Sequence, residues 1–445
     1  MKAHPVYFIP AGDYFGESSE KCYLVYSPLV NKSFLVLPEE KDRLSALLEK
    51  NETDDAVIRQ ILPDQARIDQ FHTAVKPEMT SIEFLLNERC NFSCSYCYSA
   101  GSRSSAEIDM PRIRTALQFI HSCAGKLSKE NVTVTFIGGG EPLLSWNLIE
   151  DTVAYSEDMK RQDGISTKFV LVTNGSLFTE EQIVYCREKD FDIQFSFEIL
   201  ERIQNLQRQS FEEVSGNLKK ALKARCNVFI RSTITEDNVD LLPEMAETCL
   251  KEYPEVRLIG CEPVTDAWME HDLERVRRFY ERYFESYRKA CRLLDGSGLT
   301  ISSSASRAIN HLRHRFCGPM FCLQTTGAIL ACSHFSSPDN PGFREFRYGQ
   351  VEDGNVCISE SDLRRIYGDA LPEECDRCWA RWNCGGGCGN QRYMYSREVF
   401  DIICEERRKI LLFEVLRSLE KQYAQSTGKD FVASIRALIT ARNNS

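Results

Sequence analysis

The sequence predicts an α/β fold whose core is a parallel sheet, and two observations carry that prediction. Six short stretches rich in Val, Ile and Phe alternate with segments of helical periodicity, as in successive strand–helix units. The length of 445 residues is enough for two or three domains, and 42% hydrophobic content can form a large core. The expected strands are residues 82–87, 132–137, 168–173, 191–196, 227–233 and 256–262, and the expected helices are residues 110–124, 147–160, 179–188, 210–224 and 240–252.

Three cysteines follow the first expected strand. Cys90, Cys94 and Cys97 have the spacing Cys-x3-Cys-x2-Cys, with the aromatic residue Tyr96 before the last of them. Three thiolates so close together can bind three irons of a [4Fe–4S] cluster and leave the fourth iron without a protein ligand. A zinc site and three buried thiols are the alternatives for this triplet on its own.

The triplet resembles the signature of the radical SAM superfamily. In that family S-adenosylmethionine (SAM) chelates the open iron, and one electron from the cluster splits SAM to release a 5′-deoxyadenosyl radical. The six strand–helix units fit the partial (β/α)6 barrel of the family. Sites in such barrels lie at the carboxyl ends of the strands, and the motifs of this chain follow or end expected strands.

A glycine-rich turn, Gly-Gly-Gly-Glu-Pro at residues 138–142, comes directly after the expected strand 132–137. In the resembling family this segment lies beside the cluster, and its backbone and Glu contact the SAM amino group. Glycines let a backbone approach a ligand closely, and a carboxylate suits an ammonium group. Together with the polar tip of the next strand, the resemblance implies cofactor contacts from Tyr96, Gly139, Gly140, Glu141 and Asn174.

Ser196 ends the expected strand 191–196, and Arg208 follows twelve residues later. Family members with an extra C-terminal cluster domain carry Ser-x-Asp-Gly and an Arg at this offset. There the Ser contacts the SAM ribose and the Arg contacts its carboxylate, so both roles are implied here. The chain has Glu198 and Ile199 where the Asp and Gly usually stand, which leaves the role of that Asp open, with Glu198 as its possible substitute.

A second group of cysteines lies in the C-terminal part. Its run Cys-x2-Cys-x5-Cys-x3-Cys, at residues 375–388, resembles the seven-cysteine SPASM domain, which binds two auxiliary [4Fe–4S] clusters. Zinc is the alternative, but a zinc site needs only four thiols and eight are present. Cys322 falls inside the usual pattern rather than on it, so without it the first auxiliary cluster has three protein ligands. The resemblance implies Cys317, Cys322, Cys332 and Cys388 for the first auxiliary cluster and Cys375, Cys378, Cys384 and Cys404 for the second.

The remaining cysteines and the hydropathy pattern indicate the compartment. Eleven of the 19 cysteines belong to the sets above, and most others sit in apolar or helical surroundings, where a free thiol behaves as a small hydrophobe. Residues 1–20 contain three acidic residues and no long apolar run, unlike a secretory signal. No segment approaches the roughly 18 apolar residues of a membrane span. We expect a cytoplasmic protein that has no membrane partner.

The first 80 residues form a different unit. Residues 21–37 read as a β-hairpin with turn residues Pro28 and Asn31, and helices are expected over 38–50 and 54–62. This order resembles the small leader-recognition domains of enzymes that modify ribosomally made peptides. Such domains add an extended peptide to the edge of their own sheet. A structural cap on the barrel is the alternative.

The expected division of the chain follows from these motifs. A formal net charge of −10 without a dense Lys/Arg run argues against a nucleic-acid partner. The domains are expected at residues 1–80 for the leader-recognition-like unit, 81–265 for the radical SAM partial barrel, 266–310 for a helical bridge, 311–410 for the SPASM auxiliary cluster domain and 411–445 for a helical tail.

The sequence therefore predicts a radical SAM/SPASM enzyme with three [4Fe–4S] clusters and SAM. The leading hypothesis is a maturase that cross-links a ribosomally made precursor peptide through a thioether or carbon–carbon bond, with an external electron donor such as flavodoxin or ferredoxin. An anaerobic sulfatase-maturing enzyme, which makes formylglycine, is the first alternative. A non-catalytic iron–sulfur electron carrier is the second, although residues for SAM would have no purpose there. No catalytic base is identified.

Overall fold

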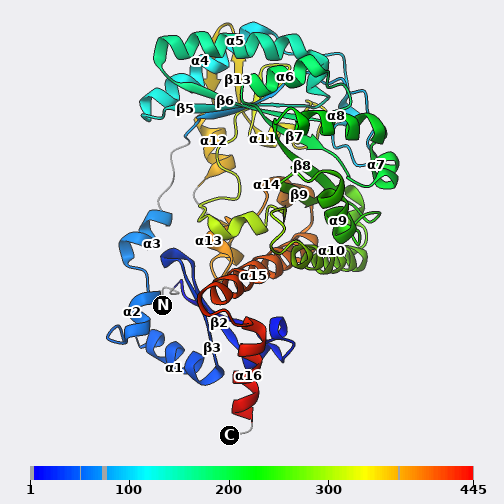
Figure 1. Cartoon of the computed structure of the whole chain (residues 1–445). Coiled ribbons are helices and arrows are strands. Elements are labelled where there is room, and N and C mark those ends of the chain that lie inside the picture. The colour runs from blue at the N-terminus through cyan, green and yellow to red at the C-terminus, as the bar shows by residue number, and fades with distance from the viewer. Residues whose placement is uncertain (1–4, 51, 73–77, 369–370, 444–445) are drawn as a thin grey trace.

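The computed structural model of the chain describes residues 5–50, 52–72, 78–368 and 371–443 (Figure 1). An open sheet of eleven strands is its centre. Six of these strands are parallel and adjacent in chain order, and each agrees with its expected range to within two residues at both ends. They are β4 (Ser81–Leu85), β5 (Asn131–Ile137), β6 (Ser166–Thr173), β7 (Asp192–Ser196), β8 (Asn227–Ile234) and β9 (Leu258–Pro263).

Helices cover one face of this parallel region, and the C-terminal helices lie on the side of the other face (Figure 1). Alternate strand residues such as Val134, Ile193 and Ile230 are buried in one apolar core with the helices. This arrangement, open at both ends of the sheet, is the expected partial barrel. The covering helices are α4 (Met110–Lys126), α5 (Trp146–Asp163), α6 (Glu180–Glu188), α7 (Glu201–Gln207), α8 (Phe211–Lys223) and α9 (Leu242–Glu252).

Five short strands extend the sheet beyond the barrel. β10 (Thr300–Ser302) pairs in parallel with β9, and β11 (Cys322–Leu323) pairs in parallel with β4. The antiparallel strands β12 (Ala328–Leu330), β13 (Arg347–Glu352) and β14 (Asn355–Ile358) continue from β11. The sequence did not predict that the cysteine-rich region continues the barrel sheet, because strands this short have no readable alternation.

The C-terminal region is otherwise helical. The long helix α15 runs through residue 410, where the sequence division places a boundary. The helices after the barrel are α10 (Leu273–Leu293), α11 (Phe343–Phe346), α12 (Glu360–Tyr367), α13 (Arg381–Cys384), α14 (Gly389–Met394), α15 (Arg397–Thr427) and α16 (Phe431–Asn443). None of the described helices is both long enough and apolar enough to cross a membrane.

The N-terminal unit has its own antiparallel sheet, with strand order β1-β2-β3. The expected hairpin is present as β2 (Tyr23–Ser27) and β3 (Lys32–Val36), and the two expected helices are α1 (Pro38–Glu49) and α2 (Ala56–Ile61). β1 (Tyr7–Pro10) and α3 (Gln65–His72) are additions to the expected set. One face of this sheet packs on α1 and α2, and the other packs on α15.

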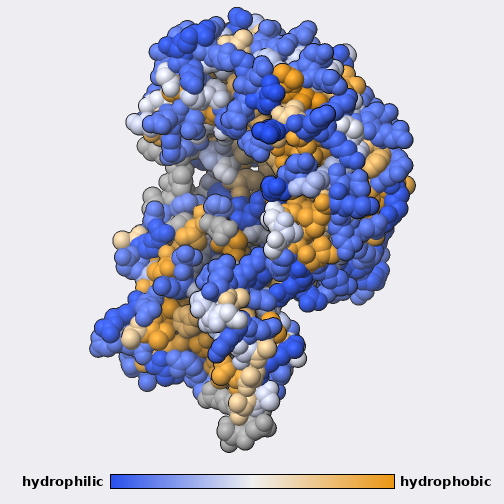
Figure 2. Space-filling model, in the orientation of Figure 1, coloured by the Kyte–Doolittle hydropathy of each residue, from blue (hydrophilic) through white to orange (hydrophobic). Residues whose placement is uncertain are grey.

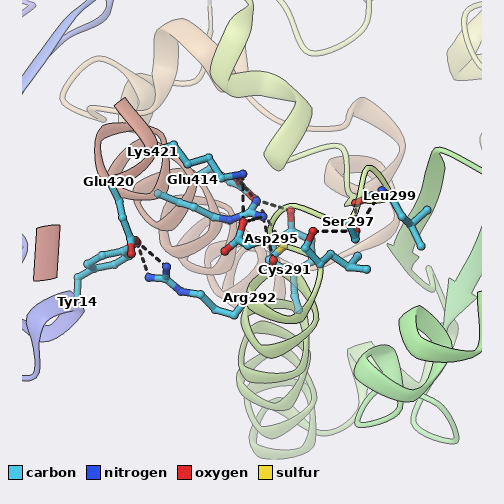
Figure 3. A network of polar contacts seen from close by, with 12 residues as sticks. Tyr14, Cys291, Arg292, Asp295, Ser297, Leu299, Glu414, Glu420 and Lys421 are labelled. Atoms are coloured by element: carbon cyan, nitrogen blue, oxygen red, sulfur yellow. Dashed lines mark hydrogen bonds and ion pairs between the residues drawn. The ribbon is translucent and has the colours of Figure 1, made fainter. Parts of the chain in front are cut away.

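Polar contacts join the N-terminal unit to the helices beneath the barrel (Figure 3). The Tyr14 hydroxyl donates to Glu420 Oε2 at 2.6 Å and accepts from Arg292 Nη2 at 2.5 Å. Arg292 also bonds Glu420 at 2.6 Å, so α10, α15 and the turn that carries Tyr14 share one network. The space-filling view shows a hollow between the barrel and the N-terminal unit, with hydrophobic residues exposed on the unit below it (Figure 2).

Candidate active site

The three cysteines of the first motif lie together in the loop after β4. Cys90, Cys94 and Cys97 are partly exposed, and the thiol of Cys94 is close enough to both others to interact with them electrostatically. Burial raises the pKa of Cys90 and Cys94. Burial also acts to raise the pKa of Cys97, but hydrogen bonds from Ser99 and Arg103 outweigh it and lower that pKa.

The glycine-rich turn after β5 packs directly on this cysteine loop. Gly140 N donates to Asn87 O at 3.1 Å, and Glu141 N donates to Arg89 O at 2.7 Å. A Cβ atom at position 140 would overlap the Arg89 carbonyl, so only glycine fits there. The Ser99 hydroxyl donates to Gly139 O at 2.6 Å and closes the contact from the other side.

Glu141 is buried and fixes the tip of the neighbouring strand. Its Oε1 accepts from the Thr173 hydroxyl at 2.5 Å, and its Oε2 accepts from Asn174 N at 2.8 Å. Burial raises the pKa of this carboxyl, although these donors act to lower it. The Asn174 side chain bonds Asn91 of the cysteine loop at 3.0 Å. The expected residues of β5 and β6 therefore meet the cysteine loop at one end of the sheet.

A buried polar network joins the cysteine loop to β7 and α7. The Tyr96 hydroxyl donates to Glu198 and accepts from Arg208 Nη1 at 2.8 Å. Glu198 is fully buried, also accepts from Ser232, and lies 4.0 Å from Arg208. Burial raises the pKa of Glu198. Ile199 has φ of +66°, a left-handed conformation that favours glycine and is uncommon for a β-branched residue.

Two polar groups of this site lack protein partners. Arg208 Nε is buried without a hydrogen bond, and among the described residues the Ser196 hydroxyl has no partner either. Buried polar atoms are normally satisfied, so an orphaned guanidinium nitrogen points to a ligand that completes the site. The chemistry of these donors suits the carboxylate and the ribose of SAM.

The first C-terminal set of cysteines is assembled from distant segments. The thiols of Cys317, Cys332 and Cys388 interact electrostatically with one another, and burial raises the pKa of Cys317 to about 12. Cys322 lies on β11, is completely buried, and interacts with Cys317 and Cys332. Its thiol donates to Glu83 Oε2 at 3.0 Å, a contact that the sequence did not foresee.

The second C-terminal set is also brought together. Cys375 interacts with Cys378 and Cys384, and Cys404 of α15 interacts with Cys384 and Cys375. Burial raises the pKa of Cys375 to about 11 and that of Cys404 to about 12. Within the described residues, no group of His, Cys, Asp and Glu is arranged to bind a single metal ion.

Sequence reasoning missed several residues that shape these sites. Asn87 bonds the Glu141 carbonyl at 3.1 Å and Ser145 at 2.7 Å, and Arg103 lies 3.7 Å from the Cys97 sulfur. Glu83 and Ser99 were also overlooked. The short distance of Ser99 and Arg103 from the cysteine triplet in the sequence was the available signal, whereas Glu83 meets Cys322 only through strand pairing.

Comparison with known proteins identifies the region around the first motif. Residues 85–249 match the family model described as the Radical SAM superfamily. The radical SAM cyclopropyl synthase TigE of Paramaledivibacter caminithermalis is 26% identical over 192 residues, which are 40% of this chain and 39% of that protein. The match thus spans about two fifths of the length of that relative.

Two further comparisons extend over more of the chain. A serine-type anaerobic sulfatase-maturating enzyme of Klebsiella aerogenes is 22% identical and covers 76% of this chain and 86% of its own length. The solved structure of anSMEcpe with bound AdoMet and Cp18Cys peptide is 16% identical, with a TM-score of 0.59, and covers 76% of this chain and 97% of its own. At this identity the structural likeness establishes the fold, which agrees with the predicted fold class.

Proposed function

The chain is an enzyme of the radical SAM superfamily, and we propose that it is a maturase that oxidatively cross-links a ribosomally made precursor peptide. The bond formed would be a thioether or a carbon–carbon bond. The observation that carries this proposal is a sheet with an open edge, β1–β3, attached to a radical SAM barrel. The solved structure of anSMEcpe contains a bound peptide, which supports a peptide substrate for this chain.

The residues around the cysteine loop fit a [4Fe–4S] cluster with SAM. The orphaned Nε of Arg208 and the free hydroxyl of Ser196 support this fit, and Gly140 lets the glycine-rich turn pack against the cysteine loop. When bound, the pair supplies a 5′-deoxyadenosyl radical that removes a hydrogen atom from the substrate. Tyr96 would act from its backbone, because its hydroxyl is engaged by Glu198 and Arg208. The residues proposed to hold this pair are Cys90, Cys94, Cys97, Tyr96, Gly139, Gly140, Glu141, Asn174, Ser196 and Arg208.

Two auxiliary [4Fe–4S] clusters would bring the total to three. The grouping of the C-terminal thiols into two sets of four supports two such clusters. The hydrogen bond of Cys322 to Glu83 means that this thiol must lose its proton to Glu83 or to solvent before it can bind iron. The clusters would accept the second electron of a two-electron oxidation, and a flavodoxin or ferredoxin would supply the electron that starts each turnover.

The edge of β3 is the proposed site of peptide capture. Ala11 N donates to Cys22 O, which fixes the alternation of hydrogen bonds across β2. The residues of β2 whose N–H and C=O groups point toward β3 are therefore 23, 25 and 27. They form hydrogen bonds with residues 36, 34 and 32 of β3. It follows that Ser33 and Leu35 direct their N–H and C=O groups away from the sheet. Within the described part of the chain these groups have no backbone partner.

The opposite edge of the same sheet is less suited to a partner strand. On β1 the outward residues are Phe8 and Pro10, and proline has no N–H to donate. A proline on an edge is one of the ways in which proteins block strand pairing. A leader segment added to β3 would instead gain main-chain hydrogen bonds from two consecutive outward residues.

The proposal is tested with the peptides encoded by short reading frames beside the gene. Each is incubated with anaerobically reconstituted enzyme, SAM and dithionite, and mass spectrometry is used to find loss of two hydrogen atoms. Fragmentation that fails between two residues of the product indicates a cross-link between them. If no flanking peptide is altered while SAM is cleaved, a peptide maturase is the wrong assignment.

A second candidate is an anaerobic sulfatase-maturing activity. Its support is the relative from Klebsiella aerogenes, which is matched over 86% of its length. Oxidation of a serine to formylglycine also removes two hydrogen atoms, so mass alone does not separate the two. Hydroxylamine traps the aldehyde of formylglycine and leaves a thioether or carbon–carbon cross-link unchanged. An oxime in the product would therefore favour the second candidate.

A further inference from the structure

The inner face of the barrel sheet carries an arginine that no part of the cofactor site uses. Along β8, Ile230 and Ser232 are completely buried on the helix-covered side, so Arg231 between them lies on the inner face. Its register partners are Ser196 on β7 and Gly260 on β9. Neighbouring strands are about 4.8 Å apart. Arg231 is thus one strand away from the serine proposed to contact the SAM ribose.

Arg231 has no counter-ion among the described residues. Its side chain is only partly exposed and makes no hydrogen bond, ion pair or ring contact there. On the same face Glu262 follows two residues after Gly260 on β9, and Arg307 already pairs with it at 3.0 Å. Arg307 also donates to Ser302 Oγ at 3.2 Å on β10. Because this carboxylate is paired with Arg307, it does not neutralise the positive charge of Arg231.

The surroundings of Arg231 add a second positive charge. Gly260 adjoins it on β9, and Arg307 Nη1 lies over this glycine, 3.9 Å from where a Cβ atom would stand. A partly buried guanidinium is stabilised by an anion, and its planar fork matches the two oxygens of a carboxylate. The strand pairing fixes the backbone of Arg231 next to that of Ser196, which places the arginine where it can orient a substrate beside the reacting atoms.

We propose that Arg231 binds a carboxylate of the peptide substrate, and that the residue modified lies next to this carboxylate. The carboxylate belongs to an Asp or Glu side chain or to the peptide C-terminus. This inference rests on the proposed peptide-modifying function and adds to it the chemical class of the substrate. It makes Arg231 a specificity-determining residue of the reaction chamber.

The test uses holoenzyme with SAM and two pools of synthetic peptides of random sequence. The pools are identical except that one contains Asp, Glu and free C-termini, and the other contains Asn, Gln and amidated C-termini. Immobilised wild-type enzyme should retain the acidic pool at least tenfold better than the neutral pool. Arg231→Gln should abolish this preference, and Arg231→Lys should keep part of it.

Arg277→Gln is the matched control, because Arg277 is exposed on α10 and pairs with Glu405 outside the barrel. It should behave as wild type, and iron content confirms that each variant is folded. Equal retention of both pools by wild type, or an unchanged preference in Arg231→Gln, would overturn the assignment of Arg231 alone. Retention of neither pool would overturn the proposed function and this assignment with it. A tenfold loss of SAM affinity in Arg231→Gln would assign the arginine to the cofactor instead.

Discussion

The two sheets of this molecule differ in the chemical groups that they leave available for contacts. In the parallel sheet β4–β9, the strands pair on both sides, and the chemistry lies in side chains and loops at their carboxyl ends. In the small sheet β1–β3, no comparable motif is present, and the distinctive feature is the unpaired outer edge of β3. In the proposed function the first sheet positions the reactive groups, and the second offers main-chain hydrogen bonds to the peptide.

This difference explains why the two regions call for different experiments. Loss of one buried side chain beside the cysteine loop removes a specific charge or ligand. Loss of one outward N–H on β3 leaves fold and chemistry in place and removes only part of a binding surface. Complete removal of residues 1–80 would be a poor test, because Val415 and Leu416 of α15 pack on Leu24 and Tyr26 of the N-terminal sheet.

The largest effect is expected from the cysteine loop. Replacement of Cys90, Cys94 and Cys97 together by Ala should abolish reductive cleavage of SAM and remove about one third of the iron, since one of three clusters loses its ligands. The auxiliary clusters should keep their iron. Cys357→Ala is the control, because this exposed thiol lies outside all three sets. Production of 5′-deoxyadenosine by the triple variant would place the SAM cluster elsewhere.

A smaller effect is expected from Arg208. Arg208→Ala should weaken SAM binding about 10- to 150-fold, because a charge-assisted hydrogen bond contributes roughly 1.5–3 kcal/mol. The variant also leaves Glu198 buried without its cation, so a lower thermal midpoint is expected as well.

Arg208→Lys separates the two effects of the Arg208 replacement. It keeps the positive charge near Glu198 but lacks the planar fork, so stability should recover more than SAM affinity does. Calorimetric titration with SAM and a thermal melt measure the two quantities. Wild-type SAM affinity in Arg208→Ala would leave Arg208 as a structural partner of Tyr96 and Glu198 only.

A change on the β3 edge should affect peptide affinity and spare the chemistry. Ser33→Pro removes an outward N–H from the edge of β3. Binding of the precursor peptide on which the enzyme acts should therefore weaken by about tenfold, or about 1.4 kcal/mol. Cleavage of SAM without peptide should be unchanged. Ser33→Ala controls for the side chain. Phe34→Pro, by contrast, removes an N–H that bonds β2 and should destabilise the unit itself. Wild-type precursor binding by a folded Ser33→Pro variant would rule out strand addition at β3.

Sequence patterns predicted the barrel and the neighbourhood of its motifs well, for physical reasons. The strands β4–β9 are apolar runs separated by amphipathic helices, and each motif directly follows such a run, so the carboxyl ends bring the motifs together. The strands β11–β14 could not be read in this way. Only β11 pairs with β4, through residues such as Cys322 and Glu83 that are far apart in the chain, and β12–β14 follow from β11.

The contacts of the buried Glu198 side chain could not be predicted from the sequence motif. Local sequence showed that Glu198 and Ile199 replace the usual Asp and Gly, but not where the longer side chain points. Its oxygens accept from Tyr96 of the cysteine loop and Ser232 of β8, which only the folded sheet brings together. Similarly, the hairpin was readable from its turn, whereas β1 was not, because a four-residue strand ending in Pro10 has little pattern.

The smallest effect is expected at the polar contacts between the N-terminal unit and helices α10 and α15. Tyr14→Phe removes a hydroxyl that bonds both Glu420 and Arg292, and a loss of about 1–2 kcal/mol is expected for hydrogen bonds to charged groups at a partly exposed site. Because Arg292 still pairs with Glu420, the ion pair should survive the change. Amide hydrogen exchange should therefore accelerate in β1–β3 and remain unchanged in β4–β9.

Tyr423→Phe is the matched control, since within the described residues its hydroxyl has no hydrogen bond. Equal acceleration in both sheets would mean that they unfold as one unit, and the division into a recognition sheet and a catalytic sheet would then hold for function but not for stability.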